Sequence, residues 1–275
     1  MSAKQILCMK WGAMYGPEYV NKLYGMAQRN VTGAFKLFCF TDNTAGVRRE
    51  VECLPLPALG CELPKHDHRG RELGKWPKVA IWNKDLGGLN GTGLFLDLDS
   101  VIVSNIDDYF TYGDPNDVIT ARNWTRPMRR MGQTSIFRFP ISGHPYMLEN
   151  LRANPVEVAC HYRFEQNYVT QCIHGGIRFW PHAWTKHFGI HCIGPWPLRA
   201  LRPAPLPRGV KIVTFPGDPK PPDAIVGRWS HHLPKLGRIE HLKWTWANRK
   251  TLHNWRKHMR CYILPCPWVE AHWRE

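Results

Sequence analysis

The chain has 275 residues, enough for one large hydrophobic core, and its composition shows no fibrous, repetitive or disordered signature. Its 37 Lys and Arg against 22 Asp and Glu give a formal net charge of +15, which indicates an anionic partner. The nine cysteines form no paired framework, and no secretory apolar region or cleavage site follows the first residues. These features argue against a disulfide-stapled secreted domain and predict a soluble, cytoplasmic protein.

Short apolar runs alternate with helical patterns over the first 120 residues, which is typical of an α/β fold. Strands are predicted at 5–10, 35–41, 51–54, 92–97, 117–121, 133–139 and 210–215. Between the first two strands, Pro17 opens a helix whose apolar stripe is Tyr19, Leu23, Met26 and Ala27. This β-α-β start predicts a right-handed crossover and a parallel strand pair.

The rest of the chain predicts further helices and a basic tail. Helical patterns return at about 77–85, 145–161 and 167–174. Five prolines between residues 195 and 207 predict an extended connector without regular structure. Residues 239–259 have a broken helical period with Lys and Arg on the other faces. We expect a core over residues 1–227 and a basic helical extension over 228–275, packed on or beside the core.

Two aspartates lie one residue apart in the apolar run 94–103, which otherwise is typical of a buried strand. A buried carboxylate without a partner is costly, so we expect Asp97 and Asp99 to serve a cation, a phosphate-bearing partner or a catalytic task. Carboxylate oxygens suit Mn²⁺ or Mg²⁺, and such an ion would neutralise the phosphate oxygens of an anionic ligand. The pattern therefore predicts a divalent metal site at these two residues.

The Asp97-Leu98-Asp99 strand resembles the metal-binding strand of GT-A-fold glycosyltransferases, especially bacterial relatives of the retaining group that includes glycogenin and the lipopolysaccharide galactosyltransferases. Further stretches resemble this family in the same order, at residues 9–12, 39–42, 51–56, 75–78, 165–166 and 215–221. The resemblance implies a single GT-A-like, Rossmann-like α/β domain with a mixed, mostly parallel central sheet flanked by helices. It also implies a metal-dependent transferase that moves a sugar, with retention, from a nucleotide-diphosphate donor, expected to be a UDP-sugar, to a glycan, lipid or protein acceptor.

The same resemblance implies roles for individual residues. The metal ligands would be Asp97 and Asp99. The nucleotide and donor would be bound by Trp11, Gly12, Lys78, Gly217 and Lys220. The catalytic pair facing the donor sugar would be Glu165 and Gln166. One departure concerns the third metal ligand: where the family has a histidine, this chain has Pro216, so Asp218, a nearby histidine or water would complete the shell.

Other functions also fit parts of the sequence. The run from Asp97 to Val101 matches the first motif of haloacid dehalogenase-like phosphatases, with Asp97 as the phosphoryl nucleophile. The basic charge, with 13 Trp, 9 Tyr and 11 Phe, also fits a nucleic-acid-binding protein, but no recognised module is present. Residues 118–148 contain five arginines and no acidic residue. This segment and the basic tail predict an acidic acceptor or a peripheral contact with the anionic inner face of a membrane.

Overall fold

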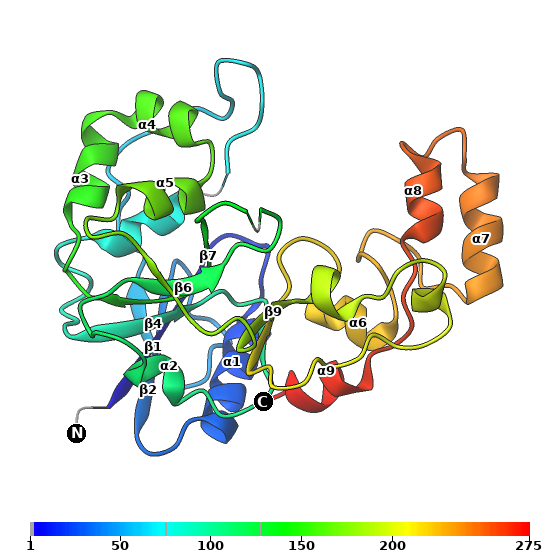
Figure 1. Ribbon diagram of the computed structural model, residues 1–275, viewed down its shortest axis with the longest axis horizontal. Helices are drawn as coiled ribbons and strands as arrows, with labels where there is room; N and C mark the ends of the chain where they lie inside the picture. Colours follow the sequence, from blue (N-terminus) through cyan, green and yellow to red (C-terminus); the bar gives the residue numbers. More distant parts are fainter. Residues whose placement is uncertain (1–2, 75, 127) are drawn as a thin grey trace.

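A seven-stranded sheet forms the centre of the computed structural model, which describes residues 3–74, 76–126 and 128–275 (Figure 1). The strands, in spatial order, are β3 (Glu52–Pro55), β2 (Phe35–Thr41), β1 (Lys4–Lys10), β4 (Thr92–Leu96), β7 (Gly132–Pro140), β6 (Ile119–Arg122) and β8 (Arg178–Phe179). The pairs among β3, β2, β1 and β4 are parallel, and β7 is antiparallel to both of its neighbours. The predicted mixed, mostly parallel sheet is therefore confirmed. Residue 75, from the family-like stretch 75–78, lies outside the described residues.

Both faces of the central strands are buried, which explains why they read as continuous apolar runs. In β1, Ile6 and Cys8 face one core, whereas Leu7 and Met9 face the other. The first core is covered by α1 (Pro17–Asn30), which starts at Pro17 as predicted and buries the predicted apolar stripe. The crossover from β1 through α1 to β2 produces the predicted parallel pair.

The opposite face of the sheet is covered by four short helices: η1 (Pro77–Trp82), α3 (Tyr146–Ala153), α4 (Pro155–Tyr162) and α5 (Glu165–Cys172). Trp82 of η1 stacks on Phe137 of β7. The single helix expected at 145–161 is two helices, because Pro155 cannot continue a helix and holds Asn154 in a non-helical conformation. The helix expected at 77–85 is a shorter 3₁₀ helix.

A second, three-stranded sheet lies beside the first, in the order β5 (Ser100–Ile102), β10 (Ile212–Thr214) and β9 (Thr185–His187). The apolar run 94–103 is therefore divided between two sheets. β4 ends at Leu96, and β5 begins at Ser100, whose N–H donates to the Asp97 carbonyl at 3.1 Å. The two aspartates occupy the turn between the sheets, which leaves their side chains free to face a cavity.

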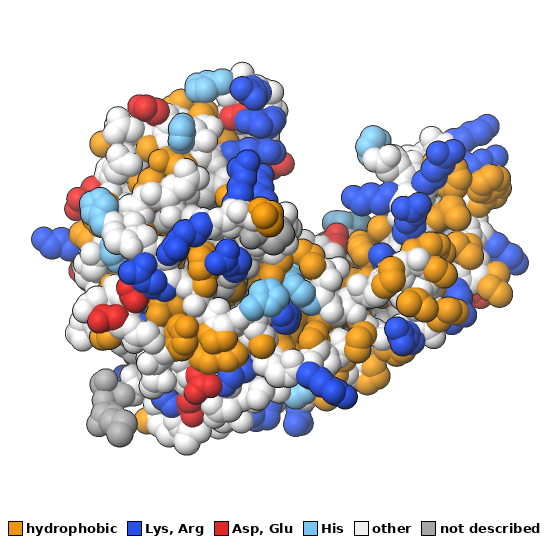
Figure 2. Space-filling view, in the orientation of Figure 1, with side chains coloured by type: hydrophobic (Ala, Val, Ile, Leu, Met, Phe, Trp, Pro, Cys, Tyr) orange, Lys and Arg blue, Asp and Glu red, His pale blue; other side chains and the backbone are white. Residues whose placement is uncertain are grey.

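The remaining elements are α2 (Asp108–Thr111), η2 (Phe188–Cys192), η3 (Leu198–Ala200), α6 (Pro221–Val226), α7 (Arg238–Ala247), α8 (Trp255–Arg260) and α9 (Pro267–His272). The proline-rich connector contains one 3₁₀ turn, η3, so the expectation of no regular structure there was wrong. The helices α7 and α8 project away from the core (Figure 1), and Figure 2 shows Lys and Arg beside hydrophobic side chains over them. The C-terminal end returns to the core, where the Trp273 ring lies 5.1 Å from that of Tyr19.

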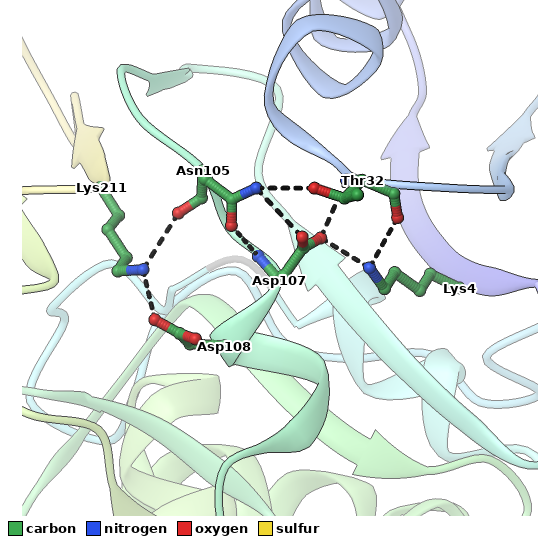
Figure 3. Close-up of polar contacts among 6 residues, drawn as sticks. All are labelled: Lys4, Thr32, Asn105, Asp107, Asp108 and Lys211. Carbon is green, nitrogen blue, oxygen red and sulfur yellow. Dashed lines mark hydrogen bonds and ion pairs between the residues drawn. The ribbon is translucent and has the colours of Figure 1, made fainter.

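A polar network joins segments far apart in the sequence at the N-terminal edge of the central sheet (Figure 3). The Asp107 carboxylate pairs with Lys4 at 2.6 Å and accepts hydrogen bonds from the Thr32 N–H at 3.0 Å and the Asn105 amide at 3.0 Å. Burial alone would raise the pKa of Asp107, but these hydrogen bonds outweigh it and hold the pKa well below its usual range. The network therefore fastens the start of β1 to the segment before α2.

We expect Asp107→Ala to lower the free energy of unfolding by about 1–3 kcal/mol, because it leaves three donors without their acceptor. The neighbouring Asp108 provides a matched control. It pairs with Lys211 at 2.5 Å, but its side chain is 53% exposed, so Asp108→Ala should cost about 0–1 kcal/mol. Urea denaturation of both variants measures the difference, and equal losses would contradict a structural role for Asp107.

Candidate active site

A cavity of about 370 Å³ opens where β1 and β4 end, at the carboxyl edge of the parallel strands. Eight of the nine predicted site residues line it: Trp11, Lys78, Asp97, Asp99, Glu165, Gln166, Gly217 and Lys220. They come from segments spread over more than 200 residues of sequence. The ninth, Gly12, is not among the lining residues. It turns the chain after β1 at a φ of +61°, and its N–H donates to the Asp42 carboxylate at 2.9 Å.

Asp97 faces the cavity and pairs with a lysine from η1. Its Oδ1 lies 2.7 Å from the Nζ of Lys78, which also donates to the Thr134 carbonyl at 3.0 Å. Burial and the neighbouring Asp99 carboxylate raise the pKa of Asp97, while the Lys78 ammonium acts in the opposite direction. Burial would lower the pKa of Lys78, but the surrounding carboxylates outweigh it and raise that pKa. The lysine is therefore fixed in its charged form beside the carboxylate.

Asp99 pairs with a second lysine from a distant segment. Its Oδ2 lies 2.5 Å from the Nζ of Lys220, the residue that precedes α6, and accepts the Tyr15 hydroxyl at 2.8 Å. The same Nζ donates to the Phe215 carbonyl at 3.2 Å. Burial and the Asp99 charge strongly raise the pKa of Tyr15, so its hydroxyl keeps its proton and remains a donor. Both aspartates thus face the cavity with a lysine as counter-charge.

The donor set fits a divalent cation. Asp97 Oδ1 and Asp99 Oδ2 each contact a lysine, and the Asp97 carboxylate also interacts with the Ser135 hydroxyl. A carboxylate has several lone pairs, so both side chains can still offer an oxygen to an ion. Pro216 also lines the cavity and contributes no side-chain ligand. A bound ion would therefore share the two carboxylates with the oxygens of its ligand and with water.

Glu165 is buried at the start of α5 and only partly satisfied. Its Oε2 accepts the Thr134 hydroxyl at 2.6 Å, whereas its buried Oε1 has no hydrogen-bond partner among the described residues. Burial raises the pKa of Glu165 to about 6, even though the Lys78 ammonium and the Thr134 hydroxyl act in the opposite direction. A buried oxygen without a hydrogen-bond partner is costly, so the position of this oxygen in a cavity indicates that a ligand donates a hydrogen bond to it.

The raised pKa of Glu165 predicts a pH-dependent change in stability. The native state holds this proton more tightly than the unfolded chain, so the stability it contributes is complete below about pH 4.5 and is lost as pH rises through about 6. The neutral Glu165→Gln side chain keeps an acceptor for Thr134 and should raise the free energy of unfolding at pH 8 by about 2 kcal/mol. No gain is expected at pH 4.5. Denaturation at both pH values tests this, and an equal effect at both would contradict it.

Several residues of this site were not found from the sequence. Tyr15 lies in the loop before α1, where nothing in the local pattern distinguishes it from an ordinary loop tyrosine. Thr134 positions both Lys78 and Glu165. The sequence did contain a signal for Thr134, because the strand predicted at 133–139 begins with three polar residues. The pair formed by Lys78 and Asp97 depends on tertiary packing and had no local signal.

The sequence matches no known family model and no curated protein significantly. Solved glycosyltransferase structures share the fold. The galactosyltransferase LgtC, in complex with donor and acceptor sugar analogues, matches with a TM-score of 0.55 and 9% identity over 92% of this chain and 99% of LgtC. GlyE from Streptococcus pneumoniae TIGR4 matches at 0.53 and 12% identity, over 94% of this chain and 63% of GlyE. The bifunctional WbbM matches at 0.52 and 12% identity, over 80% of this chain and 47% of WbbM.

These structures differ in how much of their length the chain spans. It covers about half of WbbM, less than two thirds of GlyE and nearly all of LgtC. The identities are low, so the likeness concerns the course of the backbone. The chain therefore has the fold of the GT-A glycosyltransferases, as the order of its motifs predicted.

Proposed function

We propose that this protein is a metal-dependent glycosyltransferase that moves a sugar from a nucleotide-diphosphate donor, a UDP-sugar, to a glycan, lipid or protein acceptor. The observation that carries the proposal is the convergence of Asp97, Asp99, Lys78 and Lys220 in one cavity at the carboxyl edge of the sheet. A diphosphate with its cation needs carboxylates for the metal and ammonium groups for the phosphate oxygens. The GT-A fold supports the proposal by analogy.

We assign a separate role in the reaction to each group of cavity residues. Mn²⁺ or Mg²⁺, held by Asp97 and Asp99, would neutralise charge on the diphosphate as it leaves. Lys220 would bind a phosphate oxygen with the ammonium that now pairs with Asp99, in a loop where Gly217, at a φ of +78°, keeps the backbone open to the ligand. Trp11 would provide a stacking face for the base.

We propose retention of the anomeric configuration, with Glu165 and Gln166 on the face of the donor sugar. Both residues line the cavity, and the unpartnered Oε1 of Glu165 is a ready acceptor for a sugar hydroxyl. Gln166 adds a neutral amide that can stabilise positive charge at the anomeric carbon without itself titrating. The supporting observation is the buried Oε1 of Glu165, which needs a hydrogen bond from a ligand.

A nucleotide-sugar hydrolysis screen tests the proposal without knowledge of the acceptor. We expect slow, Mn²⁺- or Mg²⁺-dependent release of UDP from one UDP-sugar, and a rise in melting temperature with UDP plus Mn²⁺. Hydrolysis of simple phosphate esters in place of nucleotide-sugars would instead indicate a phosphatase. Absence of both donor hydrolysis and UDP stabilisation would refute the proposal.

We also propose that residues 228–275 form a basic extension that contacts an anionic membrane surface from the cytoplasmic side. Helix α7 exposes Ile239 (67%) and Trp246 (55%), and Arg238, Lys243 and Arg249 lie within four residues of one or the other in the sequence. None of the described helices is long and apolar enough to cross a membrane. We expect the protein to sediment with vesicles containing anionic lipid and less with neutral vesicles, and Trp246→Ala to weaken binding. Equal binding to both vesicles would contradict this proposal.

A further inference from the structure

A cluster of imidazoles surrounds one tryptophan beside the cavity. The histidine patch consists of Arg122, Trp124, His182, Lys186, His187 and His191. The Trp124 ring centroid lies 5.7 Å from each of the His187 and His191 rings, both edge-on, and the His182 ring lies 6.0 Å from that of His191. Figure 2 shows histidines gathered in the middle of the drawn face, in the region of β9, with Lys and Arg beside them.

Two of these histidines are fixed as neutral hydrogen-bond donors. The Gly189 N–H donates to Nδ1 of His187 at 3.0 Å, and the Lys186 ammonium donates to Nδ1 of His182 at 2.9 Å. Each neutral ring must then carry its proton on Nε2. Burial lowers the pKa of His182, which favours its neutral ring. Both rings therefore present an N–H, which suits an acceptor atom of a ligand and does not suit a metal ion.

The charge of the patch is positive and uncompensated. Arg122 and Lys186 both lower the pKa of His182, so both lie near it. Among residues 3–74, 76–126 and 128–275, neither cation forms an ion pair. The two segments that supply the patch, 118–148 and 166–217, contain no Asp or Glu. An anionic group from a ligand would provide the missing partner.

The patch adjoins the cavity that would hold the donor. His187 pairs with Thr214 across β9 and β10, and Thr214 pairs in turn with Ser100, the residue after Asp99. On the other side, the Trp124 loop follows β6, where Ala121 pairs with the cavity residue Gln133.

We infer that the histidine patch is the acceptor site and that the acceptor is an anionic sugar, whose ring stacks on Trp124 and whose acid group is bound by His182, His187, Lys186 and Arg122. The inference rests on the proposed function, because the patch has this role only if the cavity holds a sugar donor. It names a class of acceptor, a sugar with a carboxylate or a phosphate. A neutral sugar would leave Arg122 and Lys186 without an anionic partner.

Saturation-transfer NMR with three small sugars tests the inference in the full chain with UDP and Mg²⁺ present. The probes are methyl glucuronide, glucose 6-phosphate and methyl glucoside. At least one anionic probe should bind about tenfold more tightly than methyl glucoside. Comparison of methyl glucuronide with glucose 6-phosphate shows whether the site prefers a carboxylate or a phosphate. Trp124→Ala and His187→Ala should each weaken that binding about tenfold. Matched controls are Trp246→Ala on α7 and His253→Ala in the turn before α8, and both variants should bind the sugars normally.

Two further measurements distinguish failure of the acceptor-site inference from failure of the proposed function. Histidine ¹⁵N spectra at neutral pH should show His182 and His187 wholly as Nε2–H tautomers, whereas unordered surface histidines exchange among both neutral tautomers and the protonated ring. Stabilisation by UDP plus Mn²⁺ should persist in Trp124→Ala, which shows that this variant is folded and binds nucleotide. If UDP binds but methyl glucoside binds as well as the anionic sugars, or Trp124→Ala binds them normally, the inference is wrong and the proposed function stands. If UDP does not bind the wild-type protein, the proposed function itself fails.

Discussion

Asp99→Ala is expected to slow hydrolysis of the UDP-sugar by about 10²- to 10³-fold and to abolish stabilisation by UDP plus Mn²⁺. The substitution removes one of the two aspartate carboxylates that face the cavity. It also leaves the Lys220 ammonium and the Tyr15 hydroxyl without the oxygen that both now contact. Lys220 remains able to bind phosphate, so weak binding of UDP without metal should survive. Initial rates from the hydrolysis screen and melting temperatures with and without Mn²⁺ measure the two effects.

The control for this prediction is Asp108→Ala. Asp108 forms a lysine ion pair of the same 2.5 Å length, but its side chain is 53% exposed, against 8% for Asp99, and it lies outside the cavity. Activity and metal response should be unchanged in this variant. Retention of Mn²⁺-dependent stabilisation in Asp99→Ala would mean that the carboxylate pair does not bind the metal.

The parts of the fold that could be predicted are those in which local sequence and tertiary environment agree. The strands β1, β2 and β4 are buried on both faces, so an apolar run was a sufficient signal for each. Pro17 and the apolar stripe after it likewise gave α1. The strands β8 and β9 have only two or three residues each. They are defined by pairing with distant segments, and no local pattern could indicate them.

In the candidate site, too, some residues had a local sequence signal and others are defined only by tertiary contacts. Asp97 and Asp99 were conspicuous because charge in an apolar run is costly. Lys78 and Lys220 came from the family resemblance, and the structure adds the physical reason for them, since each neutralises one of the two aspartates. The histidine patch could not be predicted, because its residues come from the loop after β6 and from the segment around β9. The sequence showed only that acidic residues were absent from both stretches.

Lys78→Met should destabilise the protein by about 3 kcal/mol and make its stability depend on divalent metal. Loss of the ammonium leaves the Asp97 carboxylate and the Thr134 carbonyl without their shared partner in a buried position. A divalent cation can replace the missing positive charge at Asp97. In the wild-type protein the same cation must compete with Lys78 for this carboxylate. Millimolar Mn²⁺ should therefore raise the melting temperature of Lys78→Met more than that of the wild type.

Lys4→Met is the matched control, because it breaks the comparable ion pair between Lys4 and Asp107 at 2.6 Å. The Asp107 carboxylate keeps its hydrogen bonds from Thr32 and Asn105, and the other carboxylate of the network, Asp108, stays paired with Lys211. Mn²⁺ should therefore leave this variant unchanged relative to the wild type. Equal Mn²⁺ responses in Lys78→Met and Lys4→Met would show that the cation acts nonspecifically, and the metal site at Asp97 and Asp99 would have to be abandoned.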